Sequence, residues 1–231
     1  MYKEKYDYPT VVKESTGKAG RVYFIELNGV KYDPVYSVTT ILSRMSDKKE
    51  IIEEWKRTIG HKNAQQILDK SLNFGNCMHD ILYHQIVGTP DYEKLFKQNF
   101  IFKVAGDMAK KIWEVGLKDV DEVWGAEVPL FVPECYAGRT DLVGTYKGAT
   151  SIIDFKNAYK DKKEEHMEDY FTQAAAYAVA HDYLFNTNIE QCVIFVANSS
   201  NITAKKVIKA GDDFKFYKDK WIDILDQYYS E

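Results

Sequence analysis

The stretch GRTDLVGTYKGATSIIDFKNA, from Gly138 to Ala158, places Asp141, Asp154 and Lys156 in segments that otherwise have the composition of buried β-strands. Charged side chains are seldom buried unless they are paired or bind a metal ion. The placement of these three residues therefore either serves a chemical purpose or means that the segments are not strands. The stretch decides the fold, because it predicts two neighbouring strands joined by a short turn.

The turn between the two strands sets which residues face each other. If Lys147 and Gly148 are the central residues of a two-residue hairpin turn, counting outward places Asp141 directly opposite Asp154. Directly opposed residues have Cβ atoms about 4.5–5.5 Å apart, and two like charges at that separation destabilise a sheet. A four-residue loop with the same symmetry keeps this pairing, whereas a three-residue loop shifts it by one residue.

The alternation of side chains along a strand assigns the charged residues to one face. Asp154 and Lys156 share that face, while Ile153 and Phe155 point to the opposite face, toward the core. Two carboxylates and an ammonium group then converge on one spot. A divalent cation that prefers oxygen ligands, such as Mg²⁺, would relieve the repulsion between the carboxylates, and the lysine would position a water or stabilise a charged transition state.

The composition is that of a globular protein with a substantial core. The chain has 231 residues, of which 45% are hydrophobic and 14% are aromatic, and it contains no internal repeat, low-complexity tract or Pro/Gly-rich linker. The charged and aromatic start, MYKEKYDYPT, is unlike a signal peptide, and no apolar run is long enough to span a membrane. We therefore predict a single domain over residues 1–231 with no membrane-spanning segment.

Cysteine usage and net charge narrow the class of protein. Three widely spaced cysteines, Cys77, Cys135 and Cys192, fit neither a disulfide framework nor paired zinc ligands, which favours a reducing, cytoplasmic location. The formal net charge of −4 argues against a protein that coats nucleic acid nonspecifically, although it leaves room for a local basic groove. The chain also lacks a P-loop motif, so it encodes no helicase motor.

Periodicity and turn signals predict an α+β or mixed α/β fold. A hairpin that turns at Asn28 and Gly29 comes first, followed by three helices, three strands, a helix, two strands and a final helix. Residues 1–118 thus form an N-terminal hairpin and a helical part, and residues 119–231 carry the sheet. The predicted helices cover residues 46–70 (capped by Ser46 or Asp47), 73–88, 99–117, 169–185 and 211–229, and the predicted strands cover residues 22–32, 120–132, 136–148, 150–158, 191–200 and 201–210.

Several motifs resemble those of one nuclease superfamily. GRTDLVG followed by IIDFKNA resembles the D…(D/E)xK signature of the PD-(D/E)xK nucleases, and QAAAY at residues 173–177 resembles the QxxxY helix motif of their RecB-like branch. SVTTIL, FGNCMH and GAEVPLF also resemble elements of that branch, in particular of the mitochondrial genome maintenance exonuclease and related phage exonucleases. The resemblance covers about residues 37–177. It implies a restriction-endonuclease-like core, a central mixed sheet flanked by helices, with a helical N-terminal elaboration.

The resemblance implies a role for each charged residue of the quoted stretch. Asp141 and Asp154 would bind Mg²⁺, for which Mn²⁺ substitutes. The backbone carbonyl of Phe155 would be a further ligand, and Lys156 would orient the attacking water. A DxK pattern alone is common in strands by chance, but Asp141 at the matching offset and the QxxxY motif favour the catalytic interpretation. The iron–sulfur members of the branch carry four cysteines around the core, whereas this chain has three and none in that arrangement, so no cluster is expected.

Two further residues are candidate metal ligands. His79, in the GxxxH pattern of FGNCMH, would reach the metal region, although a lone histidine four residues after a glycine is as often an ordinary helix residue. Glu127 lies on the strand before Asp141 and is either an additional ligand or a residue that faces solvent.

Candidate contacts with DNA come from three places. Gln173 and Tyr177 are four residues apart, hence on one helix face, where the superfamily uses them near the site and the DNA backbone; helix packing is the alternative, above all for Tyr177. Ser37 and Thr39 offer hydroxyls at a helix N-terminus, where capping alone would explain them. Lysines just beyond the quoted stretch would line a groove along the DNA backbone: Lys160, Lys162 and Lys163.

These features predict a metal-dependent DNA exonuclease, and the resemblance implies single-stranded DNA with a free end as its partner and substrate. One alternative is a structure-specific endonuclease that acts on flaps or junctions. Another is a noncatalytic DNA-binding recombination partner. The complete set of Asp141, Asp154, Lys156 and Gln173 argues against an inactive protein.

Overall fold

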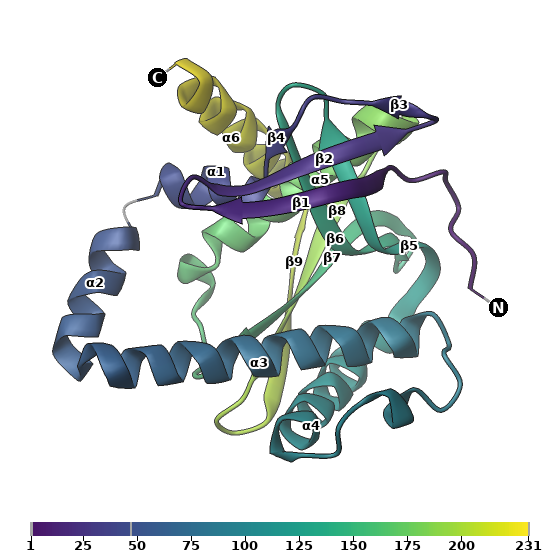
Figure 1. Cartoon of the computed structure of the whole chain (residues 1–231). Coiled ribbons are helices and arrows are strands. Elements are labelled where there is room, and N and C mark those ends of the chain that lie inside the picture. The colour runs from purple at the N-terminus through teal and green to yellow at the C-terminus, as the bar shows by residue number, and fades with distance from the viewer. Residues whose placement is uncertain (1, 47, 231) are drawn as a thin grey trace.

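Two β-sheets organise the chain in the computed structural model (Figure 1). The structure describes residues 2–46 and 48–230, except for the side chains of Lys48, Lys49 and Ile51; Asp47, a predicted helix cap, lies outside the described residues. In the described part no helix is long and apolar enough to cross a membrane. The strands are β1 (Thr10–Gly17), β2 (Gly20–Leu27), β3 (Val30–Lys31), β4 (Val35–Tyr36), β5 (Val120–Val132), β6 (Tyr136–Tyr146), β7 (Ala149–Ala158), β8 (Gln191–Asn198) and β9 (Thr203–Ala210). The helices are α1 (Val38–Arg44), α2 (Lys48–Ile59), α3 (His61–Ile86), α4 (Phe100–Val115), α5 (Glu168–Phe185) and α6 (Gly211–Ser230), with short 3₁₀ helices η1 (Tyr92–Leu95), η2 (Leu117–Asp119) and η3 (Glu164–His166).

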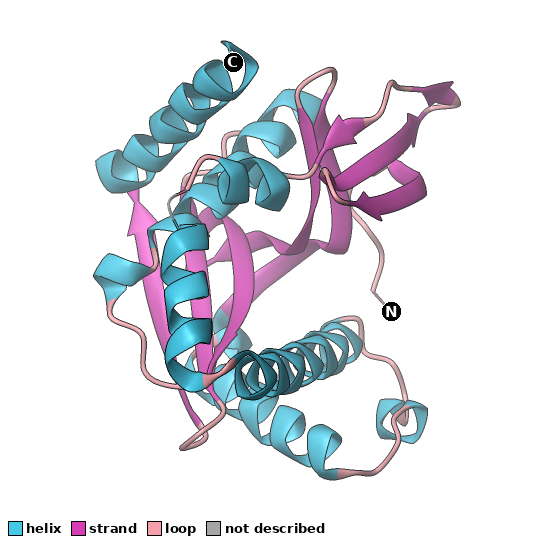
Figure 2. Cartoon of the chain, turned by 60° about the vertical axis from the view of Figure 1, so that its left-hand side comes forward, coloured by secondary structure: helices cyan, strands magenta, loops and turns pink. Residues whose placement is uncertain are grey.

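The larger sheet has the strand order β5-β6-β7-β8-β9. Strands β7 and β8 run parallel, whereas the other neighbouring strands are antiparallel, so the sheet is mixed. Two parallel neighbours need a long crossover connection, and α5 provides it. Helices lie on both sides of the strands (Figure 2). The predicted α+β class, with a central mixed sheet flanked by helices, is confirmed.

Each face of the central sheet has its own core. Ile152 belongs to a cluster that includes Phe171 of α5, while Ile153 belongs to a cluster that includes Met108 of α4. Because these two neighbours in β7 enter different cores, the strand is buried on both faces, as is usual beside a parallel strand. The face that carries Asp154 is therefore also covered, and this aspartate is itself buried.

The N-terminal sheet contains the predicted hairpin and two strands that the sequence did not indicate, β1 and the short β4. Leu27 of β2 pairs with Val30 of β3 on either side of Asn28 and Gly29, which confirms the turn. Strand β1 pairs with β2 through a second tight turn. Its residues are mostly exposed and largely polar, so no alternating apolar pattern marks it. This sheet lies beside the central one (Figure 1). Its strands β1 and β2 line part of the site described below.

The predicted break between the first two helices is wrong. It was expected after residue 70, but α2 ends at Ile59 and α3 runs without interruption from His61 to Ile86. Gly60 makes the break with a φ of 86°, a conformation that glycine adopts readily. Within α3, a Cβ atom on Gly75 would meet Oδ1 of Asn157 at 2.7 Å, so helix and strand β7 approach closely here. This approach positions the following turn of α3 against the end of β7.

The β6–β7 hairpin has the predicted register, but its ladder ends before the two aspartates. The pairs run from the turn as far as Leu142 with Ile153. At the next position Asp141 does not pair with Asp154; its Oδ2 accepts a hydrogen bond from the backbone N–H of Phe155 at 2.6 Å. The predicted direct opposition of the two aspartates is therefore wrong, although both lie at the same end of the hairpin.

Candidate active site

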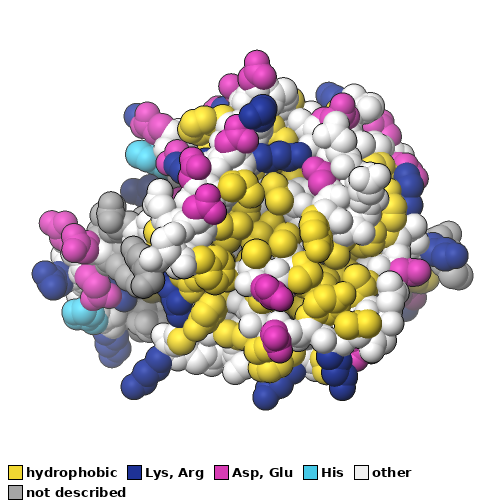
Figure 3. Space-filling model, turned by 90° about the horizontal axis from the view of Figure 1, so that it is seen from above, with side chains coloured by type: hydrophobic (Ala, Val, Ile, Leu, Met, Phe, Trp, Pro, Cys, Tyr) yellow, Lys and Arg dark blue, Asp and Glu magenta, His cyan; other side chains and the backbone are white. Residues whose placement is uncertain are grey.

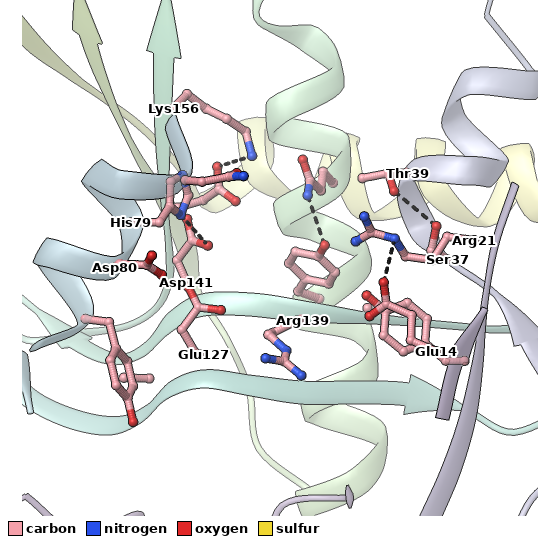
Figure 4. Close-up of a pocket in the computed structure, with 18 of the residues that line it drawn as sticks. Glu14, Arg21, Ser37, Thr39, His79, Asp80, Glu127, Arg139, Asp141 and Lys156 are labelled. Carbon is pink, nitrogen blue, oxygen red and sulfur yellow. Dashed lines mark hydrogen bonds and ion pairs between the residues drawn. The ribbon is translucent and has the colours of Figure 1, made fainter. Parts of the chain in front are cut away.

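A pocket of about 820 Å³ opens where the central sheet, the N-terminal sheet, α3 and α5 meet (Figure 4). Its wall contains most of the residues that the sequence singled out. Strands β5 to β7 supply Glu127, Asp141, Asp154 and Lys156, α3 supplies His79, α5 supplies Gln173 and Tyr177, and the start of α1 supplies Ser37 and Thr39. Residues from distant parts of the sequence thus share one cavity.

Asp141 is held at both carboxylate oxygens. Oδ1 lies 3.2 Å from Nδ1 of His79, and Oδ2 accepts the hydrogen bond from the N–H of Phe155. Burial acts to raise the pKa of Asp141, but the neighbouring His79 and Lys156 outweigh it, so this pKa lies below its usual value. Asp141 therefore stays ionised in a fixed orientation.

Asp154 and Lys156 form a close ion pair, with Nζ of the lysine 2.6 Å from Oδ2 of the aspartate. Burial raises the pKa of Asp154 to about 6; Lys156 opposes this shift and the charge of Asp141 adds to it. Burial acts to lower the pKa of Lys156, but the two aspartates raise it above its ordinary value. The lysine thus remains a cation between two carboxylates.

Glu127 has a left-handed backbone, with a φ of 54°, in the middle of β5. Such a conformation is uncommon for a residue other than glycine and is concentrated at functional sites. Ala126 packs in the core on the α3–α4 side, whereas Val128 packs in the core on the α5 side, although regular alternation would put both on one face. The left-handed residue between them accounts for this change of face. Its neighbours Ala126 and Val128 pair with Leu142 and Thr140, the two residues that flank Asp141 in β6.

His79, Glu127 and Asp141 form a compact group whose ligand atoms all lie within 4.8 Å of one another. Burial acts to lower the pKa of His79, but Asp141 raises it to about 9. Burial raises the pKa of Glu127 to about 7, and Asp141 adds to the shift. A divalent cation would offset the repulsion between Asp141 and Glu127 that adds to the shift of the Glu127 pKa. Two carboxylates with one imidazole suit Mn²⁺ well and Mg²⁺ through the oxygens, so the residues fit such an ion.

The compact group differs in part from the predicted ligand set. It includes both candidates that the sequence left open, His79 and Glu127, but Asp154 is not a member. Phe155, whose carbonyl is a predicted ligand, donates its backbone N–H to Asp141, and its ring packs in the core beside α3 and α4. Asp154 lies beside the group, close enough that the charge of Asp141 raises its pKa.

Gln173 and Tyr177 lie on the pocket side of α5, as their spacing predicted. Nε2 of Gln173 donates to the hydroxyl of Tyr177 at 2.9 Å. Burial raises the pKa of the Tyr177 hydroxyl, and its side chain also belongs to the core on the α5 side. Tyr177 therefore both packs in the core and lines the pocket.

Ser37 caps α1 and lines the pocket at the same time. Its Oγ accepts from the backbone N–H of Thr40 at 3.0 Å and lies 3.0 Å from Oγ1 of Thr39. The capping contact that the sequence offered as an alternative is made. The hydroxyls of Ser37 and Thr39 therefore engage each other as well as facing the cavity (Figure 4).

The predicted lysines lie outside this pocket. Nζ of Lys162 donates to the hydroxyl of Tyr170 at 2.9 Å and lies 4.1 Å from the centre of that ring. Lys160 and Lys162 line a separate hollow of about 270 Å³, and Lys163 is 3.5 Å from Glu165. Figure 3 shows another face, seen from above, whose centre is apolar and whose cationic side chains lie mostly toward the margin.

The pocket also contains charged residues that the sequence did not indicate. Arg21 comes from β2 and Arg139 from β6, while Asp80 and Glu4 add carboxylates. Two of these had a local signal: Arg139 stands two residues before Asp141, and Asp80 follows His79 directly. The other two come from the N-terminal segments, whose position over the central sheet depends on tertiary packing.

Known proteins offer distant likenesses to this chain. No protein-family model and no curated protein sequence matches it. A solved protein from Eubacterium rectale that carries a provisional exonuclease name is similar at 13% sequence identity and a TM-score of 0.47, over 68% of this chain and 64% of that chain. The chain thus spans just under two thirds of that protein. A second solved protein, SSO0001, is similar at 13% identity and a TM-score of 0.33, over 67% of this chain and 73% of that chain. Neither likeness is close enough to bear on function.

Proposed function

We propose that this chain is a metal-dependent DNA exonuclease that hydrolyses phosphodiester bonds at the ends of single-stranded DNA. The observation that carries the proposal is the meeting of Asp141, Asp154 and Lys156 in one pocket. The motifs that contain them resemble the catalytic signature of the PD-(D/E)xK nucleases, and the QxxxY motif lines the same cavity. Buried neighbouring carboxylates cost stability, so a structural role alone does not explain them.

His79, Glu127 and Asp141 would hold the cation, with Asp154 beside them. Such a cation, when bound, neutralises charge on the phosphate and lowers the pKa of an attacking water. The chain's own contribution is to fix these ligands. Asp141 is oriented by the N–H of Phe155, and Glu127 is turned toward Asp141 by its left-handed backbone.

Lys156 would position the water and stabilise the charge that develops on the phosphate. Its ammonium group has three N–H donors and lies 2.6 Å from Oδ2 of Asp154, and its raised pKa keeps it protonated. Fixed donors of this kind stabilise a transition state without having to reorganise. Asp154 would thus act in part by holding Lys156.

Single-stranded DNA with a free end is the preferred substrate because the motifs resemble those of exonucleases. We place the activity in DNA replication, recombination or repair. Its location would be the cytoplasm, or the host cytoplasm if a phage encodes the chain. The experiment distinguishes this proposal from two alternative functions: a flap or junction endonuclease, and a noncatalytic DNA-binding partner.

The test compares end-labelled linear and circular single-stranded DNA in Mg²⁺ or Mn²⁺. We expect the linear strand to be degraded from its ends and the circle to remain intact. Ca²⁺ should support little cleavage because its looser coordination positions the water poorly, and EDTA should abolish cleavage. Asp141→Asn protein purified in parallel measures any contaminating nuclease.

Each other outcome selects a different function. Cutting of the circle would indicate an endonuclease, and binding without cutting would indicate a noncatalytic partner. Full turnover in EDTA would remove the metal-dependent mechanism.

A further inference from the structure

The pocket contains two arginines that the proposed chemistry does not use. Arg21 and Arg139 line it together with the carboxylates. Figure 4 shows Arg139 between Glu127 on one side and the pair of Arg21 with Glu14 on the other. The candidate cation ligands thus lie toward α3, whereas the guanidinium groups lie toward the N-terminal sheet, where Glu14 pairs with Arg21.

Arg21 is fixed at both its backbone and its side chain. Its N–H donates to Oγ1 of Thr40 at 2.9 Å, and its carbonyl accepts from the N–H of Ser37 at 2.9 Å. Its Nε lies 3.0 Å from Oε1 of Glu14. A guanidinium carries five N–H donors, so the contact at Nε leaves others for a ligand. The β1–β2 hairpin thus presents Arg21 to the pocket in a defined position.

Arg139 carries a charge without a paired carboxylate. Its guanidinium makes no hydrogen bond or ion pair with any residue in the two described ranges, 2–46 and 48–230. The side chain is exposed within the pocket wall. Its charge acts on the nearby Glu127, but the two side chains form no ion pair. Arg139 instead keeps its donors available two residues away from Asp141.

We propose that Arg21 and Arg139 form a subsite for the phosphodiester next to the one that is cut. This inference rests on the proposed function, because the carboxylate side of the pocket defines the cut position. Guanidinium groups bind phosphate oxygens through paired hydrogen bonds, whereas the carboxylate side repels a phosphate that no cation accompanies. A cavity of about 820 Å³ is large enough for a ligand beyond a single phosphate group. The enzyme therefore requires two consecutive charged linkages.

The test is a cycle that combines a protein variant with a substrate variant. In a single-stranded oligonucleotide, one linkage at a time is replaced by a neutral methylphosphonate. For the wild type, a neutral linkage beside the cut position should raise KM about tenfold, as expected for one lost charge-assisted contact, while kcat changes less than about twofold. Arg139→Gln should raise KM for the unmodified strand to a similar extent. The KM of this variant should then be the same with the charged and with the neutral linkage.

Two further variants identify the cause of the change. Arg139→Lys keeps the charge but loses the planar pair of donors, so it should recover part of the affinity. Lys94→Gln removes one positive charge from η1, outside the pocket, and should leave KM and the response to the neutral linkage unchanged. Thermal melts of all three variants show whether each one is folded.

The possible results separate the subsite from the proposed function. If the increases in KM caused by Arg139→Gln and by the neutral linkage multiply, the arginine does not contact that phosphate. The proposed subsite is then wrong, while the proposed nuclease activity is unaffected. Binding of the same strands in EDTA, followed by fluorescence anisotropy, supplies a readout without cleavage. If the protein cuts no strand, but Arg139→Gln and the neutral linkage together weaken binding no more than either change alone, the subsite is supported and the proposed nuclease activity is contradicted. A loss of kcat or of melting temperature alone assigns Arg139 to another role and overturns the subsite.

Discussion

Gly138 lies directly against the ring of Tyr177, because a Cβ atom on this glycine would come within 2.4 Å of Cε1 of the ring. An alanine at this position would push the ring aside, and with it Gln173, which donates to the Tyr177 hydroxyl. We expect Gly138→Ala to lower the free energy of unfolding by about 1–3 kcal/mol, the usual cost of overpacking. It should also raise KM for DNA, because the displaced pair lines the pocket. Urea unfolding and steady-state kinetics measure both effects.

The matched control is Gly106→Ala in α4. A Cβ atom there would meet nothing within 4 Å, and alanine is a better helix former than glycine. This variant should be as stable as the wild type or more stable by up to about 1 kcal/mol. If both alanine variants unfold and cleave alike, the ring of Tyr177 yields freely and the contact does not shape the pocket.

The features that the sequence predicted well are those set by neighbouring residues. The β6–β7 register depends on one turn and on the alternation of side chains. Counting residues outward from that turn gives the correct pairs as far as Leu142 with Ile153. The spacing of Gln173 and Tyr177 is likewise a property of a single helix. Fold class followed from such local patterns added together.

The features that the sequence missed depend on contacts between distant segments or on a local change in backbone. The left-handed Glu127 ends the alternation in β5, and no turn residue marks it. The final aspartate pair was misplaced because the ladder stops where Asp141 turns to the N–H of Phe155. Arg21 enters the pocket only because the N-terminal sheet packs over the central one, and its polar partner strand β1 has no apolar pattern.

Glu127 should make the metal-free protein less stable as the pH rises. Burial raises its pKa in the folded state to about 7 from an ordinary value of 4.5. The folded state therefore binds more protons than the unfolded state between these two values, so the contribution of this group to stability is full below pH 4.5 and is lost as the pH rises through 7. Glu127→Gln cannot ionise, so in EDTA at pH 8 it should be more stable than the wild type by on the order of 2 kcal/mol.

The difference between the two proteins should vanish near pH 4.5, where the wild-type carboxyl is protonated in the folded state. Urea unfolding at several pH values in EDTA measures it. A difference that stays constant across this range would mean that Glu127 ionises normally and is not crowded by Asp141.

Tyr2 should protect the edge of β5 beside Glu127. The backbone N–H of Ala126 donates to the Tyr2 hydroxyl at 2.7 Å, so the N-terminal segment covers a donor of this strand. Tyr2→Phe removes the acceptor and should cost about 1 kcal/mol locally, with hydrogen exchange of the Ala126 amide faster by about fivefold. Exchange measured by NMR tests this. Tyr6→Phe is the control, because in the described part of the chain the Tyr6 hydroxyl makes no hydrogen bond, and unchanged exchange in both variants would contradict the contact.

The lysines beyond β7 should contribute to DNA binding through charge alone. Lys160, Lys162 and Lys163 lie outside the pocket, on the segment that follows β7. If they track the DNA backbone, the triple Lys→Ala variant should bind every sequence more weakly and should lower the slope of log Kd against log salt by about two. Fluorescence anisotropy at several salt concentrations measures this slope. An unchanged slope would assign the lysines to a solvated loop, because Lys162 already contacts Tyr170.

Asp154→Asn should lower activity without lowering the stability of the metal-free protein. Burial raises the pKa of Asp154 to about 6, so at pH 7.5 the folded metal-free protein bears the cost of a buried carboxylate beside Asp141. The amide has nearly the same shape and carries no charge that Asp141 would repel. In EDTA the variant should therefore melt at the same temperature as the wild type or slightly above it. Single-turnover cleavage in Mg²⁺ should nevertheless fall at least about a hundredfold, because an amide is a poorer partner than a carboxylate for a hard cation.

Lys156→Ala should fail in a different way. It leaves both aspartates and the group of His79, Glu127 and Asp141 in place, so metal should still raise its melting temperature and DNA should still bind. Its single-turnover rate should fall about a hundredfold or more, because a fixed donor to the transition state is lost. Its metal-free form should also be less stable than the wild type, since the charge of Asp154 is left buried without the ion pair at 2.6 Å. If instead Asp154→Asn melts well below the wild type in EDTA and still cleaves DNA, Asp154 is a structural residue of β7, and the assignment of this pair to catalysis is wrong.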